Sequence, residues 1–118
     1  MDINFVDNPN LIPKPRPEIR VEEIHAEPLE DGRRIRIELR ITPFTPADRP
    51  NITVQVLDPH GADVGTIAVI ETMHNNVAMT FHLREAVPLP GAYKVQASLY
   101  YEEQNSQGTA ETTVHLLG

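Results

Sequence analysis

The sequence lacks cysteine and tryptophan altogether, and only 5% of its 118 residues are aromatic. Because it has no cysteine, the chain can form no disulfide bond, use no thiol nucleophile and bind no cysteine-ligated zinc. This composition is compatible with a reducing compartment. Residues 1–7 carry neither the basic residues nor the apolar run of a signal peptide. We therefore expect a cytoplasmic protein.

Long hydrophobic runs and an excess of basic residues are also missing. No stretch approaches the roughly 18 consecutive apolar residues that span a membrane. Ten basic residues against 17 acidic ones give a net charge of -7. Since nucleic-acid binding requires a basic surface, we expect neither nucleic acid nor a membrane among the partners of this chain.

Residues suited to catalysis or metal binding are equally scarce. The only serines, Ser98 and Ser106, fall in an expected strand and an expected turn, with no histidine next to them in the sequence. No glycine-rich phosphate loop or dinucleotide-binding motif is present. The five histidines show no pairing at spacings of two or four residues, whereas a zinc site needs three or four converging ligands. We therefore predict a protein that is not an enzyme, with no catalytic residue, no metal site and no cofactor.

Prolines at positions 9, 13, 15 and 17 mark residues 1–17 as an N-terminal arm. Proline fixes φ and lacks an N–H donor, so residues 13–17 should be extended and polyproline-like. Two interpretations stay open. The arm docks into an aromatic-lined groove of another protein, or it lies on its own domain, which residues 18–118 form. The apolar residues that would make such contacts are Phe5, Val6, Leu11 and Ile12.

Alternation of apolar and polar side chains dominates the rest of the chain. From Tyr93 to Tyr101 every second residue is apolar or aromatic, and the residues between are Lys, Gln, Ser and Tyr. A period of two is typical of a half-buried strand. A slip of the pattern at Glu22-Glu23 predicts either a β-bulge or a strand that switches between sheets. Seven short strands separated by turn residues predict an all-β antiparallel sandwich. The expected strands cover residues 18–27, 33–42, 51–58, 63–73, 77–84, 93–101 and 109–117.

Seven strands within about 100 residues, with Gly91-Ala92-Tyr93-Lys94-Val95 near the start of the sixth, resemble the immunoglobulin-like and fibronectin type III-like sandwiches. The resemblance covers residues 18–118. It implies that Tyr93 is the structural tyrosine corner of these folds, with a hydroxyl that bonds to the backbone around residues 86–90. The chain departs from true immunoglobulin domains because it lacks both cysteines and the core tryptophan. The resemblance therefore implies no antibody-like or receptor-like function.

The outward side chains of the third, sixth and seventh strands carry few charges and include sizeable apolar or aromatic groups. Charge depletion together with Tyr and Leu is typical of interface cores, although single exposed apolar residues are ordinary. We predict a protein-interaction or assembly module that associates through this face, most simply as a two-fold homodimer. The predicted interface residues are Leu57, Gln96, Tyr100, His115 and Leu117.

The loops at one end of the sandwich offer an alternative function. If the topology is immunoglobulin-like, the connections at 42–51, 73–76 and 102–108 meet there, beside the N-terminal arm. Loops on a rigid sandwich commonly carry recognition, so this tip could bind a ligand or peptide with Phe44 as its apolar anchor. In the other interpretation, Phe44 closes the open end of the core. The predicted tip residues are Phe44, Arg49, His74, Asn75 and Asn105.

Overall fold

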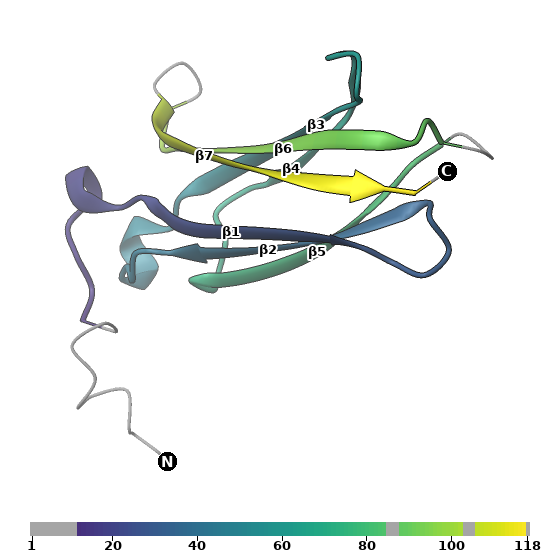
Figure 1. Cartoon of the computed structure of the whole chain (residues 1–118). Coiled ribbons are helices and arrows are strands. Elements are labelled where there is room, and N and C mark those ends of the chain that lie inside the picture. The colour runs from purple at the N-terminus through teal and green to yellow at the C-terminus, as the bar shows by residue number, and fades with distance from the viewer. Residues whose placement is uncertain (1–11, 85–87, 103–105, 118) are drawn as a thin grey trace.

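Seven strands make up the computed structural model, which describes residues 12–84, 88–102 and 106–117 (Figure 1). They are β1 (Val21–Pro28), β2 (Arg34–Ile41), β3 (Asn51–Leu57), β4 (Asp63–Val69), β5 (Asn76–His82), β6 (Gly91–Tyr100) and β7 (Ser106–Leu116). They form two antiparallel sheets, ordered β1-β2-β5 and β4-β3-β6-β7. The only helical elements in these ranges are two 3-10 turns, η3 (Arg16–Glu18) and η4 (Pro46–Asp48). The predicted all-β antiparallel sandwich is confirmed.

The core lies between the two sheets and is built by every second residue of the strands. Along β2 the isoleucines and leucine are buried while the intervening arginines and Glu38 are exposed. Burying one such aliphatic side chain contributes about 1.5–3 kcal/mol. The buried apolar residues are Ile19, Ile35, Ile37, Leu39, Ile41, Ile52, Val54, Val56, Phe81, Leu83, Tyr93, Val95, Ala97, Leu99, Val114 and Leu116.

Three expected strand limits are wrong by three residues or more. β1 begins at Val21 rather than at residue 18, β4 ends at Val69 rather than at residue 73, and β7 begins at Ser106 rather than at residue 109. β4 ends because the chain turns at Glu71, which adopts a positive φ of 47°. The Glu71 N–H donates to Asn51 Oδ1 at 2.8 Å, and the Thr72 N–H donates to the Pro50 carbonyl at 3.0 Å. These bonds carry the chain across the end of the sandwich toward β5.

The two lateral sides of the sandwich differ. On one side β1 runs alongside β7 (Figure 1). Ile19, just before β1, is fully buried, and the Gln107 side-chain amide donates to its carbonyl at 2.9 Å. The register of β1 against β2 shifts between Val21 and Glu23, at the slip of the sequence pattern, and β1 stays paired with β2 on both sides of the shift. On the other side, β4 and β5 are edge strands, and no described strand pairs with their outer edges.

Tyr93 ties the start of β6 to the segment before it. The side chain is 1% exposed, and its hydroxyl donates to the carbonyl of Leu89 at 2.9 Å. Leu89 lies four residues upstream, within residues 86–90, where the resemblance implied that this hydroxyl would bond. The buried Tyr93 side chain therefore supplies a hydrogen bond to the loop before β6 and holds that loop in place where the chain enters the strand.

Candidate functional site

The first candidate surface is the outer face of the four-stranded sheet, which we call the four-stranded face. Toward its Tyr100 end lies a row of small hydroxyl residues, because Ser98 of β6 lies opposite Thr53 of β3 and Thr109 of β7. These small side chains leave this part of the sheet accessible to a flat partner. The outward residues of β3, β6 and β7 include Thr53, Gln55, Leu57, Lys94, Gln96, Ser98, Tyr100, Thr109, Glu111, Thr113 and His115.

The five predicted interface residues fall at the two ends and in the middle of this face. Leu57 and His115 lie near the start of β6, and Leu117 follows β7 at the same end, where it is 92% exposed. Tyr100 is the last residue of β6, about 20 Å along the strand from that end at roughly 3.3 Å per residue. Gln96 lies between them. Gln96 pairs there with Gln55 and Glu111, so the apolar groups flank a polar centre.

Little net charge remains on the four-stranded face. Its outward charged residues on β3, β6 and β7 are Lys94 and Glu111, whose Nζ and Oε2 atoms lie 3.7 Å apart. Gln96 also donates to Glu111, at 3.5 Å. At the β4 edge, Asp63 accepts a 3.0 Å hydrogen bond from Gln55. The opposite outer face, on the three-stranded sheet, carries the charged residues Glu23, Glu27, Arg34, Arg36, Glu38 and Arg40.

A shallow hollow of about 470 Å³ lies at one end of the four-stranded face. Its lining consists of Thr53, Ser98, Tyr100 and Ser106, all of which carry hydroxyl groups. The Ser106 hydroxyl donates to the Gly108 carbonyl at 3.5 Å. An uncharged, hydroxyl-lined recess can accept polar or small apolar groups of a partner without leaving an unpaired charge buried.

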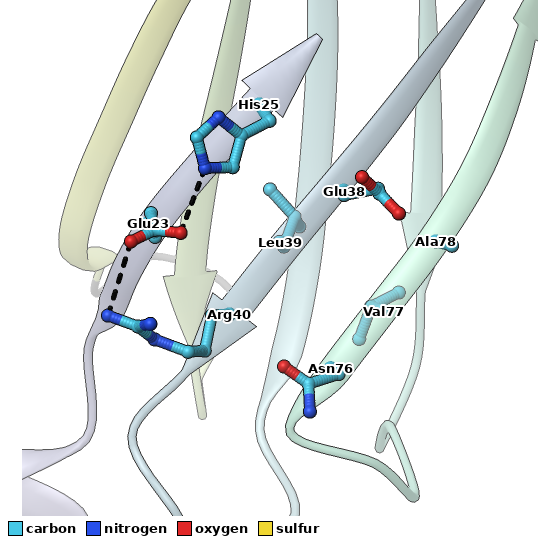
Figure 2. Close-up of a pocket in the computed structure, with 8 residues that line it drawn as sticks. All are labelled: Glu23, His25, Glu38, Leu39, Arg40, Asn76, Val77 and Ala78. Atoms are coloured by element: carbon cyan, nitrogen blue, oxygen red, sulfur yellow. Dashed lines mark hydrogen bonds and ion pairs between the residues drawn. The ribbon is translucent and has the colours of Figure 1, made fainter.

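A second hollow, of about 350 Å³, lies on the outer face of the three-stranded sheet (Figure 2). His25, Glu38 and Ala78 lie side by side on the three strands of this sheet. The hollow forms at this row because the side chain of Ala78 is small. His25 Nε2 lies 2.8 Å from Glu23 Oε1, and an Arg40 guanidinium nitrogen lies 3.4 Å from Glu23 Oε2. The hydrogen bond to His25, together with Arg40, holds the pKa of Glu23 below its usual value.

The charges of this second hollow are engaged with one another. Glu38, across the strand from His25, lies 3.3 Å from an Arg36 nitrogen. Throughout residues 12–84, 88–102 and 106–117, no three His, Asp or Glu side chains are grouped so as to hold a metal ion. We therefore interpret this hollow as a solvent-exposed surface on which side chains of opposite charge pair with one another.

The loop tip brings together four of its five predicted residues. Phe44, Arg49 and Asn75 are half-buried, and His74 is exposed. Phe44 packs against the core cluster, as the interpretation of a closed core end predicts. The Asn75 carbonyl accepts from the Ile41 N–H at 2.7 Å, which fastens this loop to β2. The fifth residue, Asn105, lies outside the described residues, and ligand binding at this tip stays a prediction.

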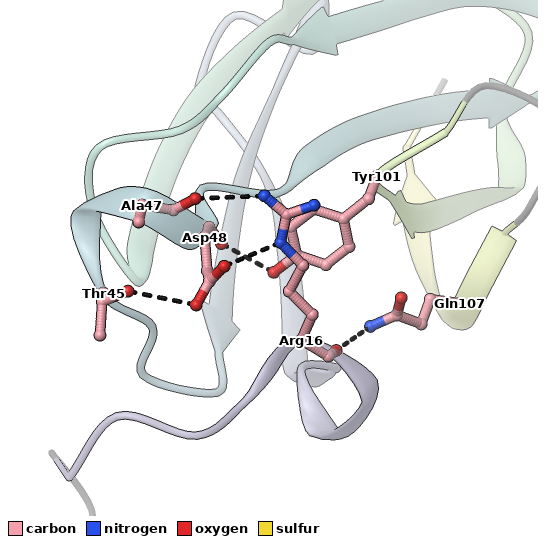
Figure 3. A network of polar contacts seen from close by, with 6 residues as sticks. All are labelled: Arg16, Thr45, Ala47, Asp48, Tyr101 and Gln107. Atoms are coloured by element: carbon pink, nitrogen blue, oxygen red, sulfur yellow. Dashed lines mark hydrogen bonds and ion pairs between the residues drawn. The ribbon is translucent and has the colours of Figure 1, made fainter.

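Arg16 fastens the end of the arm to the same loops (Figure 3). Its Nε donates to Asp48 Oδ1 at 2.8 Å, and its Nη2 donates to the Ala47 carbonyl at 3.1 Å. The guanidinium carbon lies 4.7 Å from the ring centroid of Tyr101, within the range of a cation–π contact. The Tyr101 hydroxyl donates to the Asp48 carbonyl at 2.7 Å, and Gln107 donates to the Arg16 carbonyl at 2.5 Å. No local pattern in the sequence predicts this network.

Acid is expected to release Arg16 from Asp48. The hydrogen bond from Arg16 holds the pKa of Asp48 below its usual value of 3.8. A carboxyl whose pKa is depressed in the folded state contributes stability above its unfolded pKa, and this contribution is lost as the pH falls through the folded pKa. NMR of the Arg16 side chain, which is shifted by the Tyr101 ring, should show the change below about pH 4. Asp48→Asn should remove this titration, and an unchanged acid transition in that variant would contradict the assignment.

No protein-family model and no curated protein matches the chain. Among solved structures, it is similar to part of the β-glucuronidase of Bifidobacterium dentium, with a TM-score of 0.65 and 13% identity over 83% of this chain and 18% of that one. The β-glucuronidase of Parabacteroides merdae matches with a TM-score of 0.56 and 16% identity, over 81% of this chain and 13% of that one. Lactobacillus rhamnosus β-glucuronidase matches with a TM-score of 0.51 and 18% identity, over 85% and 16%.

These neighbours share a small all-β domain with this chain. Identities of 13–18% support a common fold and nothing finer. The chain spans less than a fifth of the length of each of these enzymes, so it corresponds to one small part of them. Across the described ranges, no helix is long and apolar enough to cross a membrane.

Proposed function

We propose that this chain is a non-catalytic, immunoglobulin-like interaction module that associates with a second copy of itself through the four-stranded face. The observation that carries the proposal is the contrast between the two outer faces. The three-stranded sheet exposes six charged residues on its outward positions, whereas the four-stranded face has Lys94 and Glu111, which neutralise each other, and Asp63 at the β4 edge. Interface cores are depleted of charge in this way.

The immunoglobulin-like part of the proposal rests on topology. Each sheet pairs two strands that are not consecutive in the sequence, β2 with β5 and β3 with β6. Connections therefore pass from one sheet to the other, as they do in immunoglobulin-like sandwiches. The bond from the Tyr93 hydroxyl to Leu89 has the form of a tyrosine corner. In the β-glucuronidases, the matching region is a small fraction of a longer enzyme, which supports a non-catalytic role for this domain.

A two-fold dimer needs one patch that is complementary to itself. The row of Thr53, Ser98 and Thr109 is uncharged and small, so two copies can approach there to about the 10 Å spacing of packed sheets. Tyr100 and Leu57, toward opposite ends of the face, can then cover apolar surface on the partner. A stable contact of this kind buries about 800 Å² on each partner.

Arginine in the row of small hydroxyl residues on this face is expected to weaken the association. Ser98→Arg places a long charged side chain between Thr53 and Thr109, where a second sheet would leave the charge buried and unpaired. Sedimentation of the full chain over a concentration series should show a dimer for the unchanged protein and a dissociation constant raised at least about tenfold in the variant. Tyr100→Arg should act in the same direction.

Ala78→Arg is the matched control, since Ala78 is an outward residue of β5 on the opposite face. It adds the same charge to the other sheet and should leave the dimer unchanged. A protein that remains monomeric up to millimolar concentration, or a dimer weakened equally by Ala78→Arg and Ser98→Arg, would rule out this interface.

A further inference from the structure

The lateral side formed by β4 and β5 carries few of the features that protect sheet edges. Natural edge strands carry charges, proline or bulges that discourage pairing with another chain. The β1 edge has a shift of register, several glutamates and Pro28, and the β7 edge is flanked by β1. The β4 edge has one charged residue, Asp63, and one shift of register against β3 beside it. Residues 66–69 of β4 and 76–81 of β5 contain no proline, no charged residue and no shift of register. Both strands are nevertheless edges of their sheets.

Apolar side chains are left partly uncovered along this side. Ile67 and Val69 of β4, and Val77 and Met79 of β5, pack against the core but remain half-buried. A hollow of about 240 Å³ lies between the two strands, lined by β4 residues 64–67 and by residues Thr80 to His82 and Arg84. On the connection that follows β4, Ile70 is 65% exposed and Met73 is 69% exposed.

The charge of the hollow is positive at one end. Its lining includes Arg84 and His82 but no acidic residue, although the chain as a whole carries a net charge of -7. Among the described residues, Arg84 forms no hydrogen bond or ion pair with another side chain. We call this hollow, together with the free edge of β4, the β4 groove. It combines an unpaired strand edge, partly buried apolar side chains and the cation of Arg84 near the start of β4.

We propose that this groove binds an extended segment of a partner protein, which adds a strand to the free edge of β4. Every second residue of β4 directs its N–H and C=O toward the open edge and can pair with such a segment. Alternate apolar side chains of the segment would cover Ile67 and Phe81. An antiparallel segment ends near the start of β4, so an acidic residue at its C-terminal end would lie at Arg84. This surface is separate from the four-stranded face, and both can be occupied together.

The test uses the 15N-labelled full chain and two synthetic peptides, Thr-Val-Thr-Val-Thr-Val-Asp and the same sequence ending in Lys, both with amidated C-termini. We expect the Asp peptide to shift the amide signals of residues 64–69 and to slow their hydrogen exchange. Arg84→Glu should weaken binding of the Asp peptide by about fivefold, the upper range for an exposed ion pair. It should also reverse the preference, so that the Lys peptide binds better.

Arg36→Glu, on the outer face of β2, makes the same change of charge away from the groove and should not alter either affinity. Three outcomes would overturn the proposal. They are an absence of shifts in β4 at millimolar peptide, equal effects of the two arginine variants, and a preference for Asp that survives Arg84→Glu. Protection of the β4 amides in the peptide-free chain that grows with protein concentration would instead assign the edge to a second copy and also overturn it.

Discussion

Gly65→Ala is expected to lower the free energy of unfolding by about 2–4 kcal/mol, as a combination of backbone strain and overpacking. Gly65 in β4 has a φ of 153°, a conformation that residues with a Cβ rarely adopt. An added Cβ would lie 2.7 Å from the Cζ atom of Phe81. Phe81 is 6% exposed and belongs to the core, so its ring has little space into which to move. Urea unfolding, followed by far-ultraviolet circular dichroism, measures the loss.

Gly32→Ala separates the two causes. Gly32 also has a positive φ, of 69°, but an added Cβ there would meet no atom within 4 Å. We expect a loss of about 1 kcal/mol from the left-handed backbone alone. In the Gly65→Ala background, Phe81→Leu should cost less than it does in the unchanged protein, because it removes the clashing ring. Equal losses in the two glycine variants would show that contact with Phe81 has no part in the effect.

Strands with strict alternation could be predicted from the sequence, and the others could not be delimited. In β2, β3 and β6 a one-residue slip would turn every apolar side chain to solvent, so the pattern fixes both the strand and its buried face. β4 was predicted too long because Ile70 and Met73 continue an apolar pattern after the strand has ended. The end depends on Glu71, whose N–H bonds to Asn51, twenty residues away in the sequence.

The fastening of the arm shows the same limit more clearly. The sequence indicated an extended arm with apolar contacts. Among the described residues of the arm, the Lys14 N–H donates to the Pro43 carbonyl at 2.9 Å, and the guanidinium of Arg16 lies over Tyr101, 85 positions later. Neither Arg16 nor Tyr101 has a local pattern that reveals the other, since their contact follows from where η4 and the end of β6 meet in space. The four-stranded face could be predicted because it needs only alternation and composition, both of which are local properties.

Tyr93→Phe is expected to cost about 0.5–1.5 kcal/mol of unfolding free energy while leaving the strand in place. The substitution removes only the hydroxyl, and the Leu89 carbonyl loses the 2.9 Å hydrogen bond that it accepts. Leu89 is 41% exposed, so water can reach this carbonyl and the loss is that of a typical hydrogen bond. The ring remains the same size, so the core packing of a side chain that is 1% exposed should not change.

Tyr100→Phe provides the control within the same strand. Tyr100 is half-buried on the outward side of β6, and its hydroxyl bonds to none of the described residues, so we expect a change within about 0.5 kcal/mol. Urea unfolding of both variants gives the difference, and hydrogen exchange of residues 88–91 should increase in Tyr93→Phe alone. Equal stabilities of the two variants would mean that the hydroxyl of Tyr93 does not hold the entry to β6, and that burial of the ring alone keeps this tyrosine in place.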